Sequence, residues 1–510
     1  MMKKKAFRIA LSLLLCLPLL FSAAVCASAK QITAGDITIE SIDFQREDFI
    51  RGMDVSSLIS LENAGVKYFD EKGRETDLLK LLAQNGVNYI RVRVWNDPYD
   101  EEGRGYGGGS CDVNTACEIG RRAAKYGMKL LVDFHYSDFW ADPSKQKAPK
   151  AWENGSVKEK EDALYDFTFS SLKDIRDAGA DIGMVQIGNE TTSGIAGVSD
   201  FADMAKLFQA GSRAVRAFDR NILVAIHFTN PDRTDTMKWY ADCLDEYSVD
   251  YDVFAASYYP FWHGSLTNLN EVLSYAAQEY GKLTMVAETS YPYTLADSDG
   301  HPNTVNQWNN STGDDLLWDF TPQGQAEEIR AVMNAVNNVS DAKGLGVFYW
   351  EGAWISVGDT TGLPGDEYDA QVERNSALWE QYGCGWAASY AGEFDPDDAG
   401  KYYGGCAVDN QTFFDAGGKA LPSLKAFMAV QGFTRSYYLG DADTDGTVSV
   451  LDATAIQKHL ASLIRLSDEG ALAADVEESG QEINILCATY IQKYLAVLET
   501  GCPVGALRFV

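Results

Sequence analysis

Residues 88–95 read NYIRVRVW, a short β-branched apolar run that is typical of a β-strand. Seven further runs of this kind occur between Phe49 and Trp350. They are FIRGMDV (49–55), MKLLVDFHY (128–136), IGMVQIG (182–188), NILVAIHF (221–228), YDVFAASYY (251–259), KLTMVAE (282–288) and LGVFYW (345–350). Each run is followed by a polar loop and an amphipathic stretch, so one structural unit recurs eight times.

The stretches between the runs show helical periodicity. Residues 76–86 read TDLLKLLAQNG, which places Leu78, Leu79 and Leu82 on one face and ends at Gly86. Strands that alternate with helices imply parallel pairing, and eight units over about 300 residues imply closure into a barrel. The sequence therefore predicts an α/β fold, a (β/α)8 TIM barrel, in a catalytic domain of residues 30–432.

An open, doubly wound sheet is the alternative architecture. It would need a Gly-rich phosphate turn after the first strand, and residues 51–54, RGMD, supply none. The only Gly-rich tract, residues 105–110, follows the second run and lacks the Lys-Ser/Thr ending of a phosphate loop. We interpret this tract as a flexible loop at the rim of the barrel.

The charge balance limits the partners of the chain. Its 510 residues include 43 Lys and Arg against 74 Asp and Glu, a formal charge of −31, and 46% of them are hydrophobic. That hydrophobic share is typical of a folded globular protein. Because phosphate binding requires a basic surface, nucleic acid and anionic membrane surfaces are poor partners for this chain. Neutral substrates and divalent cations remain open.

The first 29 residues have the pattern of a signal peptide. Four basic residues precede an apolar run over residues 9–21, and Ala27 and Ala29 follow in the A-x-A arrangement of a cleavage site. A retained membrane helix is one alternative, but about 13 apolar residues are too few to span a bilayer. A lipoprotein site at Cys26 is the other, and the bulky Val25 disfavours it. Cleavage after Ala29 leaves a charge of −35, and we expect a secreted, extracellular protein with no membrane span.

Nine cysteines become seven once the signal is removed, so at least one thiol stays free. No C-x-x-C pair is present, which leaves a structural zinc site unsupported. Cys111 with Cys117, or Cys384 with Cys406, are the pairs that would bridge in an oxidising setting.

The tail of the chain, residues 433–510, contains a duplication. VLDATAIQKHLA at 450–461 returns as ILCATYIQKYLA at 485–496, 35 residues later. The segment before the first copy, DADTDGTVSVLD at 441–452, matches the EF-hand calcium loop, although an acidic surface turn is an alternative interpretation. The candidate calcium ligands are Asp441, Asp443, Asp445, Thr447 and Asp452, with Gly446 at the turn.

Residues 437–498 resemble a dockerin, the small all-α calcium-binding module that joins an enzyme to a cohesin on a scaffold protein. The second loop departs from that pattern. It carries one extra residue before Leu486 and places Cys487 where the first copy has Asp452. Because a thiol is not a calcium ligand, we expect no second calcium site of the usual kind in this loop.

Barrel enzymes place their chemistry at the carboxyl ends of the strands. The polar and aromatic residues that follow the runs are Asp54, Arg93, Trp95, Asp97, Asp133, His135, Asn189, Glu190, His227, Tyr258, Glu288, Trp350 and Glu351. The sequence contains no G-x-S-x-G elbow and no H-E-x-x-H motif. Two carboxylates in an aromatic-lined cleft are what glycosidic bond cleavage needs. Glu190 and Glu288 rank first because each ends an apolar run, Glu351 and Asp133 follow, and the pattern alone does not settle the pair.

Six ordered motifs over residues 49–430 resemble glycoside hydrolase family 53, the endo-β-1,4-galactanases. They are RGMDVSS (51–57), YIRVRVWNDP (89–98), VDFHYSDFWADP (132–143), VQIGNE (185–190), VAETSYPYT (286–294) and VFYWEGAWI (347–355). The resemblance implies a retaining mechanism with Glu190 as acid/base and Glu288 as nucleophile. It also implies that Asn189 holds the sugar 2-hydroxyl group and that Tyr258 lies near the nucleophile.

Further substrate-binding candidates come from the same strand ends. Asp133 and His135 are two residues apart and so share a strand face, and we expect Arg93 to set their charge state. An ion cluster that braces the barrel mouth is the alternative role for these three. Trp95 and Trp350 follow strands, where a flat ring can stack on a pyranose, with core packing as the alternative.

The loop after the seventh run offers oxygen or nitrogen ligands at every second position. They are Asp297, Asp299, His301 and Asn303. A polar turn is the alternative on spacing alone. The family resemblance implies a calcium site of this D-x-D-x-H-x-N pattern, closed by a downstream segment around Asp409.

The resemblances together imply a secreted enzyme that hydrolyses internal β-1,4-galactosidic bonds of galactan or type I arabinogalactan. Its cofactor would be Ca²⁺, and its dockerin would attach it to a cohesin in a cell-surface multi-enzyme complex. A barrel glycosidase acting on another neutral β-glycan such as mannan or xylan is a second interpretation, because pocket shape decides the sugar. An inactive carbohydrate-binding scaffold is a third, and the presence of both Glu190 and Glu288 speaks against it.

Overall fold

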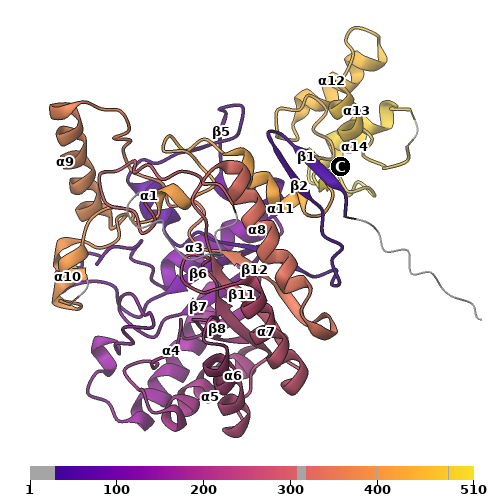
Figure 1. Cartoon of the computed structure of the whole chain (residues 1–510). Coiled ribbons are helices and arrows are strands. Elements are labelled where there is room, and N and C mark those ends of the chain that lie inside the picture. The colour runs from indigo at the N-terminus through magenta and orange to yellow at the C-terminus, as the bar shows by residue number, and fades with distance from the viewer. Residues whose placement is uncertain (1–28, 307–317, 398, 481) are drawn as a thin grey trace, which may run out of the picture.

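The computed structural model describes residues 29–306, 318–397, 399–480 and 482–510. Residues 1–28 of the expected signal peptide lie outside the described part of the chain. Eight parallel strands close into a barrel in the order β10-β11-β12-β3-β6-β7-β8-β9, which confirms the predicted TIM barrel (Figure 1). The strands are β3 (Ile50–Asp54), β6 (Tyr89–Val94), β7 (Lys129–Phe134), β8 (Ile182–Ile187), β9 (Leu223–Phe228), β10 (Val253–Ser257), β11 (Leu283–Thr289) and β12 (Gly344–Tyr349).

Helices follow the strands in sequence and surround them. The main helices are α2 (Leu78–Gln84), α3 (Val113–Lys125), α4 (Val157–Asp177), α5 (Phe201–Phe218), α6 (Thr234–Glu246), α7 (Leu266–Tyr280) and α8 (Pro322–Asn337). The predicted helix at 76–86 is α2, and the Asp77 side chain caps it by accepting a hydrogen bond from the Lys80 N–H. A longer excursion after β12 carries α9 (Gly365–Tyr382) and α10 (Ala399–Tyr402), and short α11 (Ala426–Ala429) ends the barrel domain.

Short elements complete the barrel domain. A β-hairpin of β1 (Gln31–Ala34) and β2 (Ile37–Glu40) precedes the barrel and packs on α8 and α11. After β3 come α1 (Leu58–Asn63) and the small hairpin of β4 (Tyr68–Phe69) and β5 (Glu75–Thr76).

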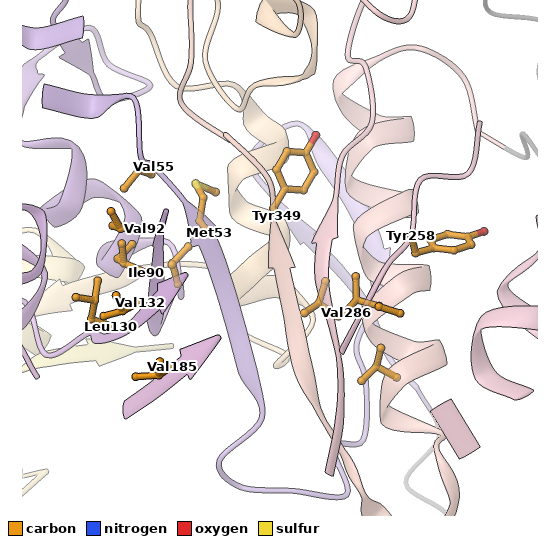
Figure 2. Close-up of a cluster of buried hydrophobic side chains, with 14 of the residues drawn as sticks. Met53, Val55, Ile90, Val92, Leu130, Val132, Val185, Tyr258, Val286 and Tyr349 are labelled. Carbon is orange, nitrogen blue, oxygen red and sulfur yellow. The ribbon is translucent and has the colours of Figure 1, made fainter. Parts of the chain in front are cut away.

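Alternation along each strand separates two buried layers. Outward-facing side chains such as Ile90 and Val92 of β6 pack against the helices in the apolar cluster of Figure 2. Inward-facing side chains such as Leu131, Met184 and Met285 form a separate cluster inside the barrel. The positions beyond this inner cluster, toward the strand ends, are polar, and they build the site described below.

The tail forms a separate unit, coloured yellow in Figure 1, of α12 (Val450–Leu460), α13 (Asp468–Ala474) and α14 (Ile485–Leu495). The duplicated segments are α12 and α14, which pack together. The expectation of an all-α module is wrong in one respect. Strands β13 (Ser436–Tyr438) and β14 (Leu507–Phe509) pair antiparallel, because the two ends of the module meet and satisfy each other's backbone groups.

The tail contacts the barrel domain directly. Ser436 Oγ donates a hydrogen bond to the Gln84 carbonyl at the end of α2, and Lys80 Nζ donates to the Gly446 carbonyl at 2.5 Å. Arg74 Nη1 lies 3.4 Å from the carbonyl oxygens of Thr444 and Asp445. The loop that resembles an EF-hand therefore sits against basic side chains of the barrel domain.

All seven cysteines beyond the signal segment are free thiols, so neither Cys111–Cys117 nor Cys384–Cys406 is bridged. Most of them are buried in apolar surroundings, where a thiol packs as a small hydrophobic group. Within the described residues, no helix combines the length and the apolar character that crossing a membrane requires.

Candidate active site

A cavity of about 270 Å³ opens at the carboxyl ends of the barrel strands. Glu190, Glu288, Asn189 and His135 line it, together with aromatic side chains from several loops. The sequence predicted these four residues as site residues, and the structure brings them together. The two glutamates lie in different hydrogen-bonding environments.

Glu288 is held by two donors. Arg91 Nη2 lies 2.7 Å from its Oε1, and the Tyr259 hydroxyl donates to its Oε2 at 2.9 Å. Burial raises the pKa of Glu288, and the Arg91 guanidinium opposes that rise. The pKa of Glu288 is raised overall, and the Arg91 guanidinium and the Tyr259 hydroxyl group act against that rise.

A shift in register aims Glu288 at the cleft. Ala287 belongs to the inner cluster, so strict alternation would turn the next side chain outward. The register between β10 and β11 changes at this point, and Ser257 pairs with Glu288. A bulge re-aims side chains in this way and is common beside active sites.

Glu190 accepts hydrogen bonds from hydroxyl groups and has a strained backbone. Its Oε1 accepts a hydrogen bond of 2.6 Å from the Ser257 hydroxyl group. Burial, and then the carboxylate of Glu288, raise the pKa of Glu190 to about 8. Its φ of 43° lies in the left-handed region, a conformation that is costly for a non-glycine residue and concentrates at functional sites. Glu190 is therefore suited to remain protonated at neutral pH and donate a proton.

Arg91 organises the floor of the cleft. Its Nη1 donates to Asp54 Oδ2 at 2.8 Å, and its Nη2 lies 2.8 Å from Asp133 Oδ2 and 2.9 Å from Asn189 Oδ1. Burial alone would raise the pKa of Asp133, but Arg91 and then His135 hold it below its usual value. Asn189 in turn donates through Nδ2 to the Ala141 carbonyl, which fixes its orientation.

His135 is locked beside Asp133. Its Nδ1 accepts hydrogen bonds from Trp95 Nε1 at 3.0 Å and from the Ala141 N–H at 3.3 Å. Its Nε2 lies 3.0 Å from Asp133 Oδ2, so the proton sits on Nε2. Asp133 and His135 thus share a strand face, as their spacing predicted.

Tryptophan rings form one wall of the cleft. Trp140 and Trp386 stack with ring centroids 4.7 Å apart and an interplanar angle of 17°. Trp350 completes this group, and Trp262, 53% exposed, lines the cavity from the loop after β10. Flat apolar rings beside hydrogen-bonding groups suit the faces and hydroxyls of a sugar. The sequence predicted Trp350 as a substrate-binding residue; Trp386 and Trp262 were missed, because neither directly follows an apolar run.

Two predicted contacts are corrected by the structure. The Tyr258 backbone N–H donates to the Glu288 carbonyl oxygen at 2.8 Å, but its side chain lies in the outer apolar cluster of Figure 2 and its hydroxyl group donates to the Gly264 carbonyl. Tyr259, the next residue, binds Glu288 instead. Ser257 faces inward, and side chains alternate between the two faces of a strand, so Tyr259, two residues later, faces inward as well. Similarly, Arg91 rather than Arg93 pairs with Asp133. Arg91 and Arg93 face inward alike, so the stagger between the strands decides which of them reaches Asp133.

Arg93 and Trp95 are buried against Trp140 and do not line the cavity. Arg93 Nη1 lies 2.5 Å from Glu351 Oε1, and its guanidinium carbon lies 4.4 Å from the centre of the Trp140 ring. Trp95 has no exposed surface and contacts Trp140 edge-on, so it supports the aromatic wall instead of meeting a sugar. Glu351 is buried and does not line the cavity. This position argues against Glu351 as one of the catalytic pair.

The proposed calcium ligands of the barrel form a compact acidic cluster. One carboxylate oxygen from each of Asp297, Asp299 and Asp409 lies within 4.8 Å of the other two. Burial, and then Asp409, raise the pKa of Asp299 well above its usual value. No described Lys or Arg forms an ion pair with these three.

The neighbours of this cluster fit a hard cation in part. Asn303 Nδ2 donates to Asp409 Oδ1 at 2.6 Å, while the buried Asn303 Oδ1 has no hydrogen-bond partner. His301 does not join the cluster. Its ring lies against Gly404 and Trp379, because the loop turns at Gly300 with a φ of 87°. The residues present therefore suit a calcium ion held by carboxylate and amide oxygens.

The two loops of the tail differ as the sequence suggested. Carboxylate oxygens of Asp441, Asp443 and Asp452 lie within 4.8 Å of one another, and Asp441 Oδ1 is buried without a hydrogen-bond partner. Burial, and then Asp452, raise the pKa of Asp441 to about 6. Asp445 lies outside this group of three, and its Oδ1 accepts from the Thr447 N–H at 2.8 Å.

The second loop gathers no such group among its described residues. Asp475 Oδ2 accepts the Gly480 N–H at 2.8 Å, and Cys487 is buried in the core of the module. The carboxylate that would complete the loop is absent, so the two repeats are not equivalent.

Comparisons with known proteins agree with the barrel fold. The profile of Glycosyl hydrolase family 53 matches residues 50–427. An endo-beta-1,4-galactanase of Bacillus subtilis (strain 168) is 54% identical over 398 residues, which cover 78% of this chain and 90% of that protein. An arabinogalactan endo-beta-1,4-galactanase of Humicola insolens is 33% identical over 60% of this chain and 90% of its own length.

Two solved structures superpose on the chain. The GH53 catalytic domain of Ignisphaera aggregans is 38% identical, has a TM-score of 0.66, and covers 77% of this chain and 99% of its own. A fungal beta-1,4-galactanase has a TM-score of 0.57 at 29% identity, covering 76% of this chain and 99% of its own. The sequence match over most of the barrel domain, the closed eight-stranded barrel and the paired glutamates lead to one conclusion: the chain is a glycoside hydrolase that belongs to glycosyl hydrolase family 53.

Proposed function

We propose that the protein hydrolyses internal β-1,4-galactosidic bonds of galactan and type I arabinogalactan by double displacement. The observation that carries the proposal is the asymmetry of the two glutamates. Glu288 is bound by a cation and a hydroxyl donor, whereas burial and its acidic neighbour raise the pKa of Glu190 to about 8. An ionised carboxylate and a protonated one in one aromatic cleft are the two partners of a retaining glycosidase.

In the first step, a Glu288 carboxylate oxygen attacks the anomeric carbon while Glu190 gives its proton to the departing glycosidic oxygen. A bond forms between Glu288 and the sugar, and the bond to the leaving chain breaks. In the second step, the ionised Glu190 takes a proton from water, and the water oxygen displaces Glu288 from the anomeric carbon. Each glutamate returns to its starting protonation state.

The names of the relatives support galactan as the substrate, because they are endo-beta-1,4-galactanases of bacterial and fungal origin. Trp386, which stacks on the buried Trp140, would offer a flat ring to a sugar, and Asn189, which lines the cavity, would bind the 2-hydroxyl group. Mannan or xylan as the substrate, and an inactive binding scaffold, remain outcomes of the test.

The test is hydrolysis by the purified protein of galactan, arabinogalactan, mannan, xylan and cellulose, read as new reducing ends. Galactan and arabinogalactan should be cleaved at least about tenfold faster than the others, with short oligosaccharides released early from internal cuts. Preference for mannan or xylan would refute the substrate assignment. No hydrolysis of any polymer would favour the binding scaffold.

The cluster of Asp297, Asp299, Asn303 and Asp409 would hold a calcium ion in the barrel domain. A bound cation would neutralise buried carboxylates and brace the loop after β11, whose strand carries Glu288. Its role would be structural, since the cluster does not line the catalytic cavity.

The tail would act as a dockerin, with its first loop binding calcium. The start of each duplicated helix exposes a pair of apolar side chains, Val450 with Leu451 and Ile485 with Leu486, each between 49% and 60% exposed. Exposed apolar pairs repeated on one small module suit a protein partner such as a cohesin. Binding of the protein to immobilised cohesins, measured with and without chelator, tests this role.

Residues 1–29 would direct export of the protein to the extracellular space. There the enzyme would encounter its polysaccharide substrate and the cell-surface complex. N-terminal sequencing of the protein recovered from the culture medium tests this. A mature chain that begins at Lys30 is expected, and full-length protein retained in cells would refute export.

A further inference from the structure

A buried chain of hydrogen bonds leads away from the proposed acid/base. Ser257 Oγ donates to Glu190 Oε1 at 2.6 Å, and His227 Nε2 lies 2.9 Å from Ser257 Oγ. Ser257 and His227 have no exposed surface and do not line the catalytic cavity. They therefore cannot touch a bound substrate, and any effect on catalysis must pass through Glu190.

The neighbours of His227 decide the direction of these hydrogen bonds. The backbone N–H of Glu190 points at His227 Nδ1 from 3.3 Å, and Gln186 Nε2 lies 3.0 Å from the same atom. Asn189 Oδ1, 3.1 Å away, already accepts from Arg91. Nδ1 is thus an acceptor, and the single hydrogen of the neutral ring lies on Nε2.

Neutrality of the ring follows from its surroundings. Burial, and then the Arg91 guanidinium, lower the pKa of His227 well below its usual value. The Nε2 hydrogen therefore points at Ser257 Oγ, which leaves the hydroxyl hydrogen of Ser257 for Glu190 Oε1. The chain runs in one direction, from the imidazole through the hydroxyl group to the carboxyl group.

We propose that His227 and Ser257 are positioning residues that keep Oε1 of Glu190 a hydrogen-bond acceptor, so that the catalytic proton is carried on Oε2. This inference rests on the proposed role of Glu190 as acid/base. With Oε1 occupied by a donor, the carboxyl proton is favoured on Oε2, and the carboxylate left after proton transfer is stabilised by a donor already in place. The sequence neighbours of Ser257 give no sign of this role, because the contact depends on the register of β10.

Other groups face this chain from every side. The hydroxyl group of Thr229, at the end of β9, also hydrogen-bonds Glu190, and Glu288 of β11 and Asp142 of the loop after β7 face it. The charged or titratable groups facing His227 are Arg91, Asp133, His135 and His263. All of them remain in a Ser257 variant, so a change in pH dependence reports the lost hydroxyl group.

The test compares Ser257→Ala with the wild-type enzyme over pH, using galactan and a dinitrophenyl β-galactobioside. The Ser257 hydroxyl group stabilises ionised Glu190 and so lowers the pKa of Glu190. Loss of that hydroxyl group in Ser257→Ala should therefore raise the pKa of Glu190. Because Glu190 must be protonated to act, the alkaline limb of kcat/KM for galactan should move up by about one pH unit. Activity on galactan should fall about 10- to 100-fold, while kcat/KM for the dinitrophenyl substrate, whose leaving group needs no acid, should change less than about threefold.

Two further variants keep the test decisive. Ser257→Cys fills the same space with a weak donor and should shift the limb in the same direction, even if the alanine variant folds poorly. Ser60→Ala is the matched control, since it removes a buried hydroxyl group that donates only to the Ser57 carbonyl. It should leave both profiles unchanged.

An unmoved alkaline limb, with equal losses on both substrates, would overturn the positioning role. Glu190→Gln distinguishes this from failure of the proposed function. If Glu190→Gln loses galactan hydrolysis while Ser257→Ala keeps the wild-type limb, the acid/base assignment stands and the positioning role is refuted. If Glu190→Gln retains full activity, the proposed function itself is wrong.

Discussion

Arg91 Nη2 lies 2.7 Å from Oε1 of Glu288, across the barrel from the strand that carries the arginine. The same nitrogen also meets Asp133 and Asn189, so one guanidinium group joins side chains from β7, β8 and β11. Both members of this pair are buried, which strengthens their attraction relative to a surface pair. The contact sets both the position and the protonation of the proposed nucleophile.

Replacing Arg91 by Lys should raise the pKa of Glu288, because a single ammonium group cannot serve Asp54, Asp133 and Glu288 together. Glu288 must be ionised to attack, so the acidic limb of the kcat/KM profile on galactan should move to higher pH. Activity at the optimum should fall at least about 100-fold. The control is Arg122→Lys, which alters an ion pair with Glu62 and Asp77 on the outer helices and should leave the profile in place. An acidic limb that does not move would contradict the role given to Arg91.

Glu190→Gln and Glu288→Gln should each lower kcat on galactan by several orders of magnitude without unfolding the barrel, since each removes one half of a double displacement. The alkaline limb of the wild-type profile should lie near pH 8, where Glu190 loses its proton, and should be absent from the Glu190 variant.

Azide separates the two roles. With an activated substrate, azide should rescue Glu288→Gly to an inverted glycosyl azide and Glu190→Gly to a retained one, identified by NMR. A crystal structure should show the two carboxylates about 5 to 5.5 Å apart, whereas a separation near 9 Å would indicate inversion. An inactive Glu351→Gln beside an active Glu288→Gln would show that the nucleophile is assigned wrongly.

Chelation should lower the thermal unfolding temperature of the barrel domain in the full chain by about 5 °C, because a cation on Asp299 and Asp409 would bind only the folded state. Asp299→Ala should abolish that response, and Asp369→Ala, on the exposed face of α9, should preserve it. Differential scanning calorimetry in calcium and in excess chelator measures both. An unchanged melting curve in chelator would remove the site.

Calcium titration of the full chain should distinguish the two loops of the tail. Asp441→Ala removes a carboxylate from the first loop and should weaken its calcium site at least about 100-fold, because ligand charge sets the affinity of such loops. Asp475→Ala, the equivalent change in the second loop, should alter the isotherm little. The isothermal titration calorimetry uses protein that carries Asp299→Ala, so that calcium binding to the barrel cluster does not contribute to the measured heat. Two tight calcium sites of equal affinity in the tail would contradict the interpretation that the second loop lacks a usual calcium site. No calcium binding by the tail would refute its dockerin-like role.

Local sequence patterns were sufficient to predict much of the fold and some of the residues that line the cavity. All eight strands were found from short apolar runs, because a buried strand needs contiguous β-branched and apolar residues wherever it lies in the barrel. Glu190 and Glu288 were found because each ends such a run, and the carboxyl ends of parallel strands meet at one face. The first tail loop was found because its carboxylate spacing is itself local, and Asp441, Asp443 and Asp452 converge as that spacing implies.

Contacts across the barrel were decided by the tertiary structure alone. The sequence favoured Arg93 as the partner of Asp133, whereas Arg91 takes that place, since the stagger between strands decides which inward residue reaches which partner. It favoured Tyr258 beside Glu288, whereas the hydroxyl group that binds Glu288 belongs to Tyr259. The bulge opposite Ser257 turns Glu288 into the cleft and brings Ser257 within reach of Glu190. Trp386 joins Trp140 from 246 residues away. The sequence determined the barrel and the ends of its strands, because periodicity is a property of neighbours along the chain. Only folding determined the partners of each site residue, because those distances depend on strand register and loop packing.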